Sequence, residues 1–274
     1  MNITSFYKIM TKIADMRVAG LLGICVICMF AVMSCGNDKS SKAPKDTMIS
    51  GTIDISVDET YRPVIEQQLK VFDSSFPEAH INVKYKSESE CIKDYMDGKA
   101  RLILITRDLS PDEIKVLENK KVVSTAMPIA KDAVAIIVNN SNTDTVFSKI
   151  KIQGILTGQY NKSYTVVFDN TGSSTLRYMM DSLIPGEKLA PNVYAAKGND
   201  SVIKYVADNP GAVGFISVSY VSDFNDPEAL AFISDVKVAA VYNDSLEKTY
   251  KPYQGYIAPD WYPFTRKLYY VHRE

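Results

Sequence analysis

Histidine is scarce in this sequence of 274 residues, which contains only His80 and His272. Zinc sites and catalytic triads depend on histidine, so the sequence offers little support for either kind of site. An excess of basic residues is lacking as well, with 31 Lys and Arg against 32 Asp and Glu. No basic stripe of the kind that binds nucleic acid is present, and we expect neither a metal, nor another cofactor, nor a nucleic-acid partner.

Cysteines that could build a disulfide framework are also lacking. Of the four cysteines, Cys25, Cys28 and Cys35 fall in the N-terminal segment, which leaves Cys91 alone in the rest of the chain. Disulfide-rich folds are therefore excluded, and we expect Cys91 to behave as a small hydrophobic residue on a short amphipathic helix.

The N-terminal segment resembles a bacterial secretory signal. Basic residues precede the uncharged run at 18–34, which is close to the lower length limit for a membrane span, and a polar stretch follows. Val32-Met33-Ser34-Cys35 resembles the lipobox of bacterial lipoproteins, whose cysteine is lipidated after cleavage. We therefore expect a signal peptide at 1–34, lipid on Cys35 and a linker over 35–50. An uncleaved N-terminal anchor is the alternative.

Strand and helix patterns alternate regularly from Gly51 onward. Apolar residues recur at every second position in the expected strands and at every third or fourth position in the expected helices. The strands are expected at 51–57, 80–86, 101–106, 132–139, 164–168, 192–196, 212–216, 236–242 and 266–272, and the helices at 61–76, 88–97, 148–156, 174–183 and 200–211, with one more helix starting at Ser110. This alternation predicts an α/β fold, and the length of the region favours two lobes.

Three of the expected strand-to-helix turns carry side chains that suit an anion. They contain Asp58, Glu59, Thr60 and Tyr61; Thr106 and Arg107; and Asn170, Thr171, Gly172, Ser173, Ser174 and Thr175. Ligands of α/β folds lie beyond the carboxyl ends of strands, where free N–H groups of helix N-termini attract anions. Hydroxyls and arginine donate hydrogen bonds to oxygen. Each turn alone could be a plain helix cap, but three in this topology favour an anion site.

The turn at 172–175 does not match a known nucleophile or nucleotide motif. A nucleophile elbow has the pattern Gly-x-Ser-x-Gly, and its second glycine is missing here. The Gly-x-x-x-x-Gly-Lys pattern of a phosphate-binding loop is absent from this turn too. A histidine base would have to be His80 or His272. A hydrolase is therefore disfavoured, and we expect no enzyme.

With these turns in view, the sequence resembles the periplasmic phosphate-binding protein family of ABC phosphate importers, in its lipoprotein form. The resemblance extends from about Gly51 to Tyr270 and rests on the order and spacing of several segments. They are ITRDLSPDE (105–113), KDAVAIIVN (131–139) with IQGILTGQY (152–160), NTGSST (170–175), VIKYVADNPGAVGFI (202–216) and YPFTRKLYYV (262–271), which matches the family's Tyr-Pro-x-x-Arg strand.

The resemblance implies a two-lobed α/β fold of the type II periplasmic-binding-protein kind, with mixed sheets flanked by helices and a ligand cleft between the lobes. Lobe one would hold residues 51–129, lobe two residues 130–217, and residues 218–274 would return to lobe one in truncated form. The residues expected to bind phosphate are Asp58, Thr60, Tyr61, Thr106, Arg107, Asn170, Ser173, Ser174 and Thr175.

The sequence departs from the family at four ligand positions. Glu59 lies in a loop that is Gly/Ser-rich in the family, and Glu88 aligns with a family serine. Arg101 falls at the aspartate that accepts the proton of monohydrogen phosphate, and Asn170 falls at a family arginine. The added carboxylates repel an anion, whereas Arg101 would attract one.

The expected function is extracytoplasmic capture of inorganic phosphate, or a related oxyanion, for the membrane permease of an ABC transporter. The protein would be held on the lipid bilayer of the bacterial cell envelope by its N-terminal anchor. Asp58 or Asp169 would take over the role of proton acceptor. The alternative is a degenerate or truncated relative that acts as an interaction or sensing lipoprotein without transport. A stoichiometric ligand in the purified protein would separate the two.

Overall fold

The structure, a computed structural model, describes residues 46–47, 49–221 and 234–274, which belong to one compact unit, Asp46–Glu274. The expected signal peptide at 1–34, the expected lipidation at Cys35 and most of the linker at 35–50 lie outside the described residues. Among the described helices, none combines the length and the apolar character that a membrane span requires.

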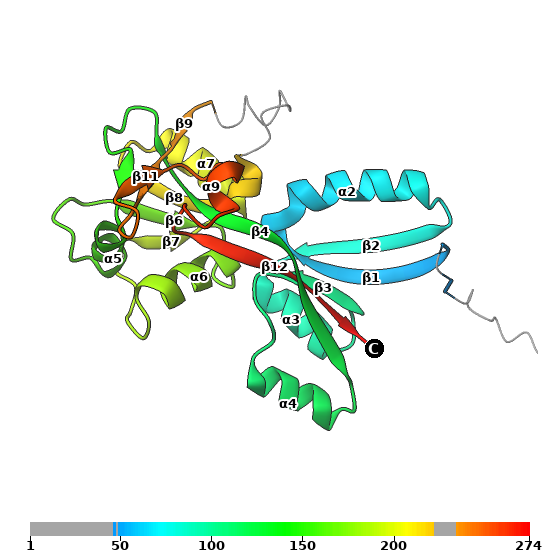
Figure 1. Cartoon of the computed structure of the whole chain (residues 1–274). Helices are drawn as coiled ribbons and strands as arrows, with labels where there is room; N and C mark the ends of the chain where they lie inside the picture. Colours follow the sequence, from blue (N-terminus) through cyan, green and yellow to red (C-terminus); the bar gives the residue numbers. More distant parts are fainter. Residues whose placement is uncertain (1–45, 48, 222–233) are drawn as a thin grey trace, which may run out of the picture. The chain divides into compact units, whose positions relative to one another are not determined.

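The α/β fold expected from the alternating patterns is confirmed (Figure 1). The strands are β1 (Gly51–Asp58), β2 (Ala79–Lys86), β3 (Leu102–Ile105), β4 (Ser124–Asn139), β5 (Val146–Phe147), β6 (Thr165–Phe168), β7 (Val193–Ala195), β8 (Ala212–Ser217), β9 (Val236–Val238), β10 (Ala240–Asn243), β11 (Lys248–Tyr250) and β12 (Thr265–Arg273). The helices are α2 (Arg62–Ser75), α3 (Glu88–Met96), α4 (Pro111–Asn119), α5 (Lys149–Thr157), α6 (Ser174–Leu183), α7 (Asn199–Asp208) and α9 (Gln254–Ile257), with the 3₁₀ turns η1 (Glu59–Tyr61) and η2 (Val218–Tyr220).

The first lobe is built on the strand order β2-β1-β3-β12-β4. β1 runs parallel to β2 and β3, whereas β12 runs antiparallel to β3 and to the first part of β4. Figure 1 shows α2 on one side of β1 and β2, with α3 and α4 on the other. Val57 faces the α2 side, next to Tyr61, while Ile103 and Ile105 pack with Tyr95 of α3. The strands therefore carry a core on each face.

The second lobe is built on the strand order β4-β8-β6-β7, with β9 also paired to β4. β6 runs parallel to β7 and β8, and β8 runs antiparallel to β4. Every residue of β8 is buried, which matches its nearly continuous apolar sequence. A small sheet of order β11-β10-β5 adds to this lobe through Phe147 and Val241, which belong to its core.

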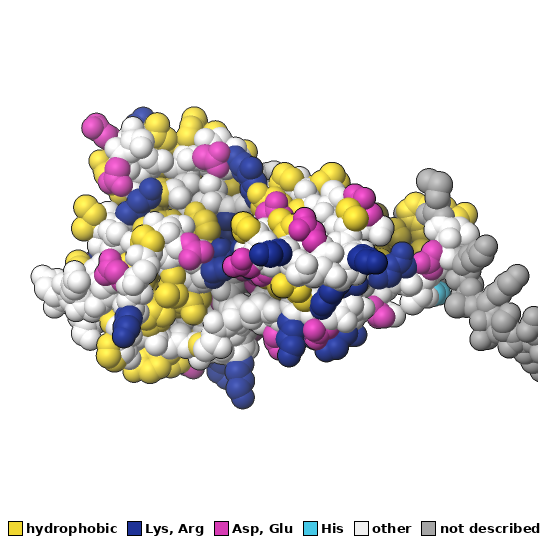
Figure 2. Space-filling model, turned by 90° about the horizontal axis from the view of Figure 1, so that it is seen from below, with side chains coloured by type: hydrophobic (Ala, Val, Ile, Leu, Met, Phe, Trp, Pro, Cys, Tyr) yellow, Lys and Arg dark blue, Asp and Glu magenta, His cyan; other side chains and the backbone are white. Residues whose placement is uncertain are grey.

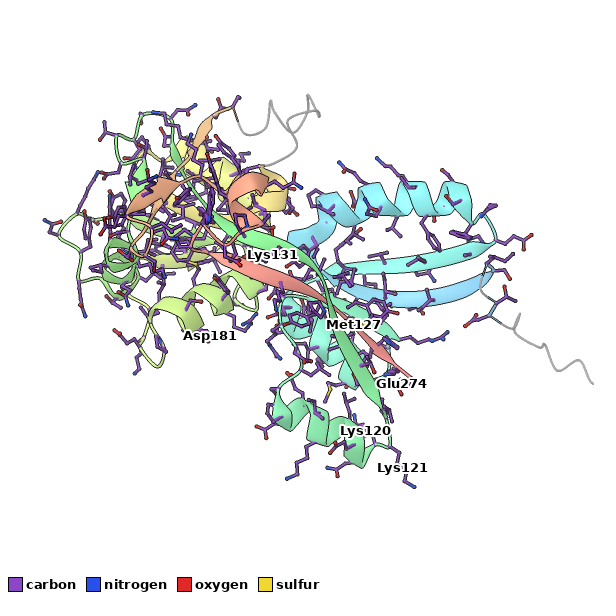
Figure 3. The ribbon with its side chains drawn as sticks, viewed as in Figure 1. Lys120, Lys121, Met127, Lys131, Asp181 and Glu274 are labelled. Carbon is purple, nitrogen blue, oxygen red and sulfur yellow. The ribbon has the colours of Figure 1, made fainter. Side chains whose placement is uncertain are left out.

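Strand β4 belongs to both lobes. Its residues 124–133 pair with β12, and its residues 134–138 pair with β8. Figure 3 labels Met127 and Lys131 on this strand as it passes from one lobe to the other. The sequence predicts a strand only at 132–139, because the preceding stretch has no apolar periodicity. Pairing with β12 makes that stretch a strand despite its weak pattern.

The C-terminal region differs from the expected return of 218–274 to lobe one. β9 pairs with the second part of β4, and Val241, Ile257 and Phe264 lie in the core of the second lobe. Within the described part of this region, β12 is the strand that joins β3 in the first lobe. The expected strand at 236–242 is divided at the buried Ala239, because β9 pairs with β4 whereas β10 pairs with β5 and β11.

Charged side chains of both signs are intermixed on the face shown in Figure 2. Lysine and arginine alternate there with aspartate and glutamate, and hydrophobic side chains lie between them. No patch of a single sign covers this face, which agrees with the near balance of 31 basic and 32 acidic residues in the chain.

Candidate functional site

Hydrogen bonds between the lobes gather at the carboxyl ends of their strands. Beyond β8, the Ser219 hydroxyl donates to the Thr60 carbonyl at 2.6 Å. Beyond β6, the Asn170 side-chain amide donates to Glu59 Oε1 at 2.6 Å. Strand ends and helix starts coincide in α/β folds, so free helix N–H groups are brought to the same place. This is the region in which the sequence predicts an anion site.

The turn from β1 into η1 supplies three buried polar side chains. Asp58 Oδ1 accepts a hydrogen bond from the Thr60 N–H at 3.1 Å, which fixes the turn. The Asp58 Oδ2, Thr60 Oγ1 and Tyr61 hydroxyl oxygen atoms are buried without a hydrogen-bond partner among the described residues. Buried polar groups are seldom left without a partner, so these three atoms mark a place suited to a polar ligand.

The hydroxyl groups at the start of α6 have two different roles. Ser173 is the N-cap, because its Oγ accepts from the N–H groups of Thr175 and Leu176 at 3.0 and 3.3 Å, and it also donates to Asp169. The hydroxyls of Ser174 and Thr175 accept from Arg266 Nη1 at 3.1 and 3.3 Å. Ser173 therefore caps α6, whereas Ser174 and Thr175 bind the guanidinium of Arg266.

Arg266 is the buried cation of this site, and the sequence reasoning did not select it. Its Nε donates to Asp132 Oδ2 at 2.8 Å, its guanidinium lies 5.8 Å from the ring centroid of Tyr61, and its Nη2 has no partner among the described residues. Burial alone would lower the pKa of Arg266, but Asp132, together with Tyr61 and Asp58, outweighs it and raises that pKa. The signals were the Tyr262-Pro263-x-x-Arg266 pattern and an aspartate opening an apolar strand.

Thr106 reaches the boundary between the lobes, but its donors are engaged by Glu88. The Thr106 N–H and hydroxyl both donate to Glu88 Oε1, at 2.9 and 2.6 Å. Arg177 of α6 donates from Nε to Glu88 Oε2 at 2.5 Å and from Nη2 to Thr106 Oγ1 at 2.7 Å. A carboxylate of the chain thus occupies donors that we expected to face the ligand.

Two arginines lie away from this cluster, which differs from the sequence expectation. Arg107 donates through both terminal nitrogens to Glu113 at 2.8 Å, because the capping carboxylate of α4 lies beside it. Arg101 precedes β3, at the opposite end of the strand from Thr106, and forms an exposed pair with Asp46. Neither arginine has a hydrogen bond to the buried polar groups around Arg266 among the described residues.

A cleft opens between the lobes, as the resemblance implies. It has a volume of about 890 Å³. It is lined by Glu59, Tyr85, Lys86, Ser87, Ser89 and Glu90 of the first lobe and by Asn170, Thr171, Gly172, Ala196, Lys197 and Gly198 of the second lobe. Asn170 is engaged on both sides at the rim of the cleft, because its Oδ1 accepts from the Gly172 N–H while its amide nitrogen donates to Glu59.

Two carboxyl groups of the site hold their protons more tightly than usual. Burial, together with repulsion from Glu88, raises the pKa of Asp58 to about 7. Burial also raises the pKa of Asp169 to about 6, although the Ser173 hydroxyl and the positive charge of Arg266 act in the opposite direction. Near neutral pH, both groups can therefore donate or accept a proton.

The arrangement offers no support for a serine nucleophile. The Ser173 hydroxyl is bonded to Asp169 and caps α6. His80 pairs in register with Thr52 at the start of β1, whereas the site lies at the end of that strand, beyond Asp58. His272 lies near the C-terminal end of β12, next to Thr125 of β4. A histidine base is therefore distant from the Ser173 turn in both cases.

The sequence matches the family described as PBP superfamily domain over residues 42–274. The phosphate-binding protein PstS of Pseudomonas aeruginosa is 23% identical over 198 residues, which cover 64% of this chain and 61% of that protein. The protein of the same name from Bacillus subtilis is 23% identical over 214 residues, or 71% and 68% of the two chains. The aligned part of this chain thus spans less than two thirds of the Pseudomonas protein.

A solved structure with the same fold comes from Clostridium perfringens. It is a candidate phosphate ABC transporter substrate-binding protein with bound phosphate. The TM-score is 0.68 at 23% sequence identity, and the superposition covers 82% of this chain and 87% of that one. Similarity at this level establishes a common two-lobed fold.

Proposed function

Because this chain belongs to the PBP superfamily domain family, we propose that it is an extracytoplasmic solute-binding protein that captures phosphate for an ABC importer. Two relatives that carry the name phosphate-binding protein PstS support this function, as does the fold shared with a protein solved with bound phosphate. The protein would bind and release its ligand between two lobes and would carry out no catalysis.

The observation that carries the proposal is the set of unpaired donors in the buried interior of the site. Thr60 Oγ1, the Tyr61 hydroxyl and Arg266 Nη2 are all buried without a partner among the described residues, and each can donate to an oxygen atom. A tetrahedral oxyanion accepts several hydrogen bonds at once, one of which would be charge-assisted by Arg266. A neutral apolar ligand would leave these donors unsatisfied.

Asp58 and Asp169 are the proposed acceptors of the ligand's proton. Phosphate carries at least one proton near neutral pH, whereas sulfate carries none, so an ionised carboxylate at the site favours phosphate. Asp58 is the stronger candidate, because its Oδ2 is buried, unpaired and on the same turn as Thr60. Asp169 already bonds Ser173 with one oxygen, although its Oδ2 has no partner among the described residues.

The N-terminal segment gives the proposal its cellular setting. We infer that residues 1–34 direct export and that Cys35 carries the lipid that holds the protein at the bacterial cell envelope, facing away from the cytoplasm. Lipid attachment would keep the binding lobes near the membrane permease. Metabolic labelling with a radioactive fatty acid, compared with Cys35→Ala, tests this part: label that survives the substitution would contradict it.

A second candidate function is an interaction or sensing lipoprotein without transport. The observation in its favour is that Glu59 and Glu88 engage Asn170 and Thr106, two residues predicted to bind the ligand. In this alternative, the polar groups between the lobes would stabilise the fold, and oxyanion affinity would be weak or absent.

Thermal unfolding of the purified chain with phosphate, sulfate or chloride separates the two functions. A ligand at 100 times its Kd stabilises by about 2.7 kcal/mol, which corresponds to a rise of roughly 5–10 °C for a chain of this size. A rise with phosphate alone supports the phosphate receptor. A cooperative transition that none of the anions moves would contradict it and favour the second function.

A further inference from the structure

Glu88 places a permanent negative charge beside the proposed phosphate site. Its side chain is 2% exposed, and Thr106 and Arg177 together donate to both of its oxygens. Burial disfavours the ionised form, but the bonds from Arg177 and Thr106 outweigh it and hold the pKa of Glu88 below its usual value. Glu88 therefore stays ionised wherever the protein is folded near neutral pH.

The arginines of this region are each paired with a carboxylate. Arg266 is paired with Asp132, Arg177 with Glu88 and Arg107 with Glu113. The other ionisable groups that interact with this region are Asp58, Glu59, Tyr61, Lys86, Glu90, Cys91, Asp94, Asp169 and Asp181, and Lys197 lines the cleft. Lys86 pairs with Asp94, and carboxyl groups outnumber cations in this set. The region therefore offers a ligand hydrogen-bond donors but no excess of positive charge.

An anion that enters such a region is stabilised by local donors and opposed by the carboxylates. The opposition grows with each unit of charge on the ligand, because Coulomb energy is proportional to that charge and is weakly screened in a buried site. A singly charged oxyanion carries half the charge of a doubly charged one and brings more protons for Asp58 to accept. It therefore suits this donor set better.

On the basis of the proposed function, we propose that Glu88 is a specificity-determining residue that makes the site select singly charged over doubly charged tetrahedral oxyanions. Dihydrogen phosphate is then the preferred ligand form, and sulfate is rejected by its charge as well as by its lack of a proton. Figure 3 labels Asp181, which follows Arg177 by one helical turn on α6 and accepts a second bond from it at 3.1 Å. Arg177 is thus held against Glu88 and is not free to bind a ligand.

Titration calorimetry of wild type and Glu88→Gln with phosphate and with sulfate, each at pH 5.5 and pH 8.5, tests the proposal. Phosphate changes from mostly singly to mostly doubly charged over this range, whereas sulfate stays doubly charged, and comparing the two proteins at one pH cancels the ionisation of Asp58 and Asp169. We expect Glu88→Gln to strengthen phosphate binding more at pH 8.5 than at pH 5.5, and sulfate binding about equally at both. An effect of the substitution on phosphate that is the same at both pH values would overturn the inference.

Glu88→Gln then removes the charge while keeping the side-chain shape. We expect sulfate affinity to rise by about tenfold or more, since two unit charges separated by roughly 10 Å in a protein change a binding constant by about that factor. Glu118→Gln, on the exposed face of α4, removes the same formal charge away from the site and should leave the ratio of phosphate to sulfate affinity unchanged.

The double variant Glu88→Gln/Arg177→Gln removes both charges of the ion pair, so its net charge equals that of the wild type. It distinguishes an effect of the Glu88 charge from an effect of Glu88 on the position of Thr106. If charge decides selectivity, the double variant regains the wild-type rejection of sulfate. If Glu88 only positions Thr106, the double variant behaves like Glu88→Gln, and the inference is overturned while phosphate binding stands. Absence of phosphate binding by the wild type at both pH values would instead overturn the proposed function, and this inference with it.

Discussion

Arg266 and Asp132 lie directly opposite each other on the adjacent antiparallel strands β12 and β4, and both are buried. Their side chains join through Arg266 Nε and Asp132 Oδ2 at 2.8 Å. The pair lies near the point where β4 passes from one lobe to the other, and the same arginine reaches the hydroxyls of α6. One ion pair therefore connects the strand crossover with the proposed ligand site.

Arg266→Gln should lower the free energy of unfolding by about 3–5 kcal/mol, because it leaves the buried carboxylate of Asp132 uncompensated. The double variant Arg266→Gln/Asp132→Asn should recover most of that loss, since no unpaired charge remains. Urea unfolding at pH 7 measures both. A single variant as stable as the wild type would show that the pair is not buried as described.

Asp58→Asn should reduce the dependence of stability on pH. The pKa of Asp58 is about 7 in the folded protein against 3.8 in its ordinary state, so the folded protein holds a proton that the unfolded chain releases. Stability from this group is present at low pH and is lost as the pH rises from about 4 to about 7. Relative to the wild type, the variant should therefore gain about 3 kcal/mol between pH 5 and pH 8.

Urea unfolding of wild type and Asp58→Asn at pH 5, 6, 7 and 8 measures this gain. Asparagine keeps an oxygen that can accept from the Thr60 N–H, so the η1 turn is preserved. Asp54→Asn, in the same strand at an exposed position, is the matched control. A stability difference that stays constant from pH 5 to pH 8 would contradict the raised pKa.

Gly172→Ala should oppose the approach of the lobes. A Cβ at this position would overlap Ser89 Oγ and would lie 3.1 Å from Ser87 Oγ, and both serines belong to the other lobe. Gly172 does not have a left-handed backbone, so the effect of the methyl group comes from these contacts with Ser87 and Ser89 rather than from backbone strain. Overpacking costs roughly 1–3 kcal/mol, and we expect about tenfold weaker phosphate binding by calorimetry.

The companion variant Gly172→Ala/Ser89→Ala removes the hydroxyl that the methyl group meets. Phosphate affinity should return most of the way to the wild-type value, and small-angle scattering with phosphate should show the same compaction as the wild type. If the companion variant binds as weakly as Gly172→Ala, the contact between Gly172 and Ser89 does not control the approach of the lobes.

Cys91 should resist alkylation until the chain unfolds. Its thiol is fully buried in the core of the first lobe, and burial, reinforced by nearby carboxylates, raises the pKa of the thiol well above its usual value. The reactive thiolate is therefore scarce. Peptide mapping after iodoacetamide treatment should find Cys91 modified only in urea. Rapid modification of the native protein would show that the α3 side of the core opens readily.

Much of the fold could be predicted because its strands and helices carry strong patterns. The apolar residues of β1 and β8, and the capping box at Ser110 and Glu113, identify their elements without tertiary information. The first part of β4 could not be predicted, because Pro128 and Lys131 interrupt its pattern and partner strand β12 lies far away in the sequence. Pairing with β12 stabilises this part of β4 as a strand, although its own sequence pattern does not predict one.

The candidate site was predictable where polar groups follow a strand, as at Thr60 and Ser174. Arg266 was harder to identify, because its role depends on a cross-strand partner at Asp132 rather than on its neighbours in the sequence. Arg107 shows the reverse error: its place after a strand suggests a ligand role, but Glu113 of the next helix binds its guanidinium. The position of these residues in the sequence indicated the end of the sheet at which the polar groups gather, but it did not indicate which hydrogen-bond donors were already paired.

The sharing of β4 between the two sheets also has a consequence for how the protein melts. Residues 124–133 hold one sheet together and residues 134–138 the other, in one uninterrupted strand. Disrupting either sheet frees part of β4 and so destabilises the strand pairing of the other sheet. The chain should therefore lose both cores in a single calorimetric transition, with equal van't Hoff and calorimetric enthalpies, rather than as two independently melting domains.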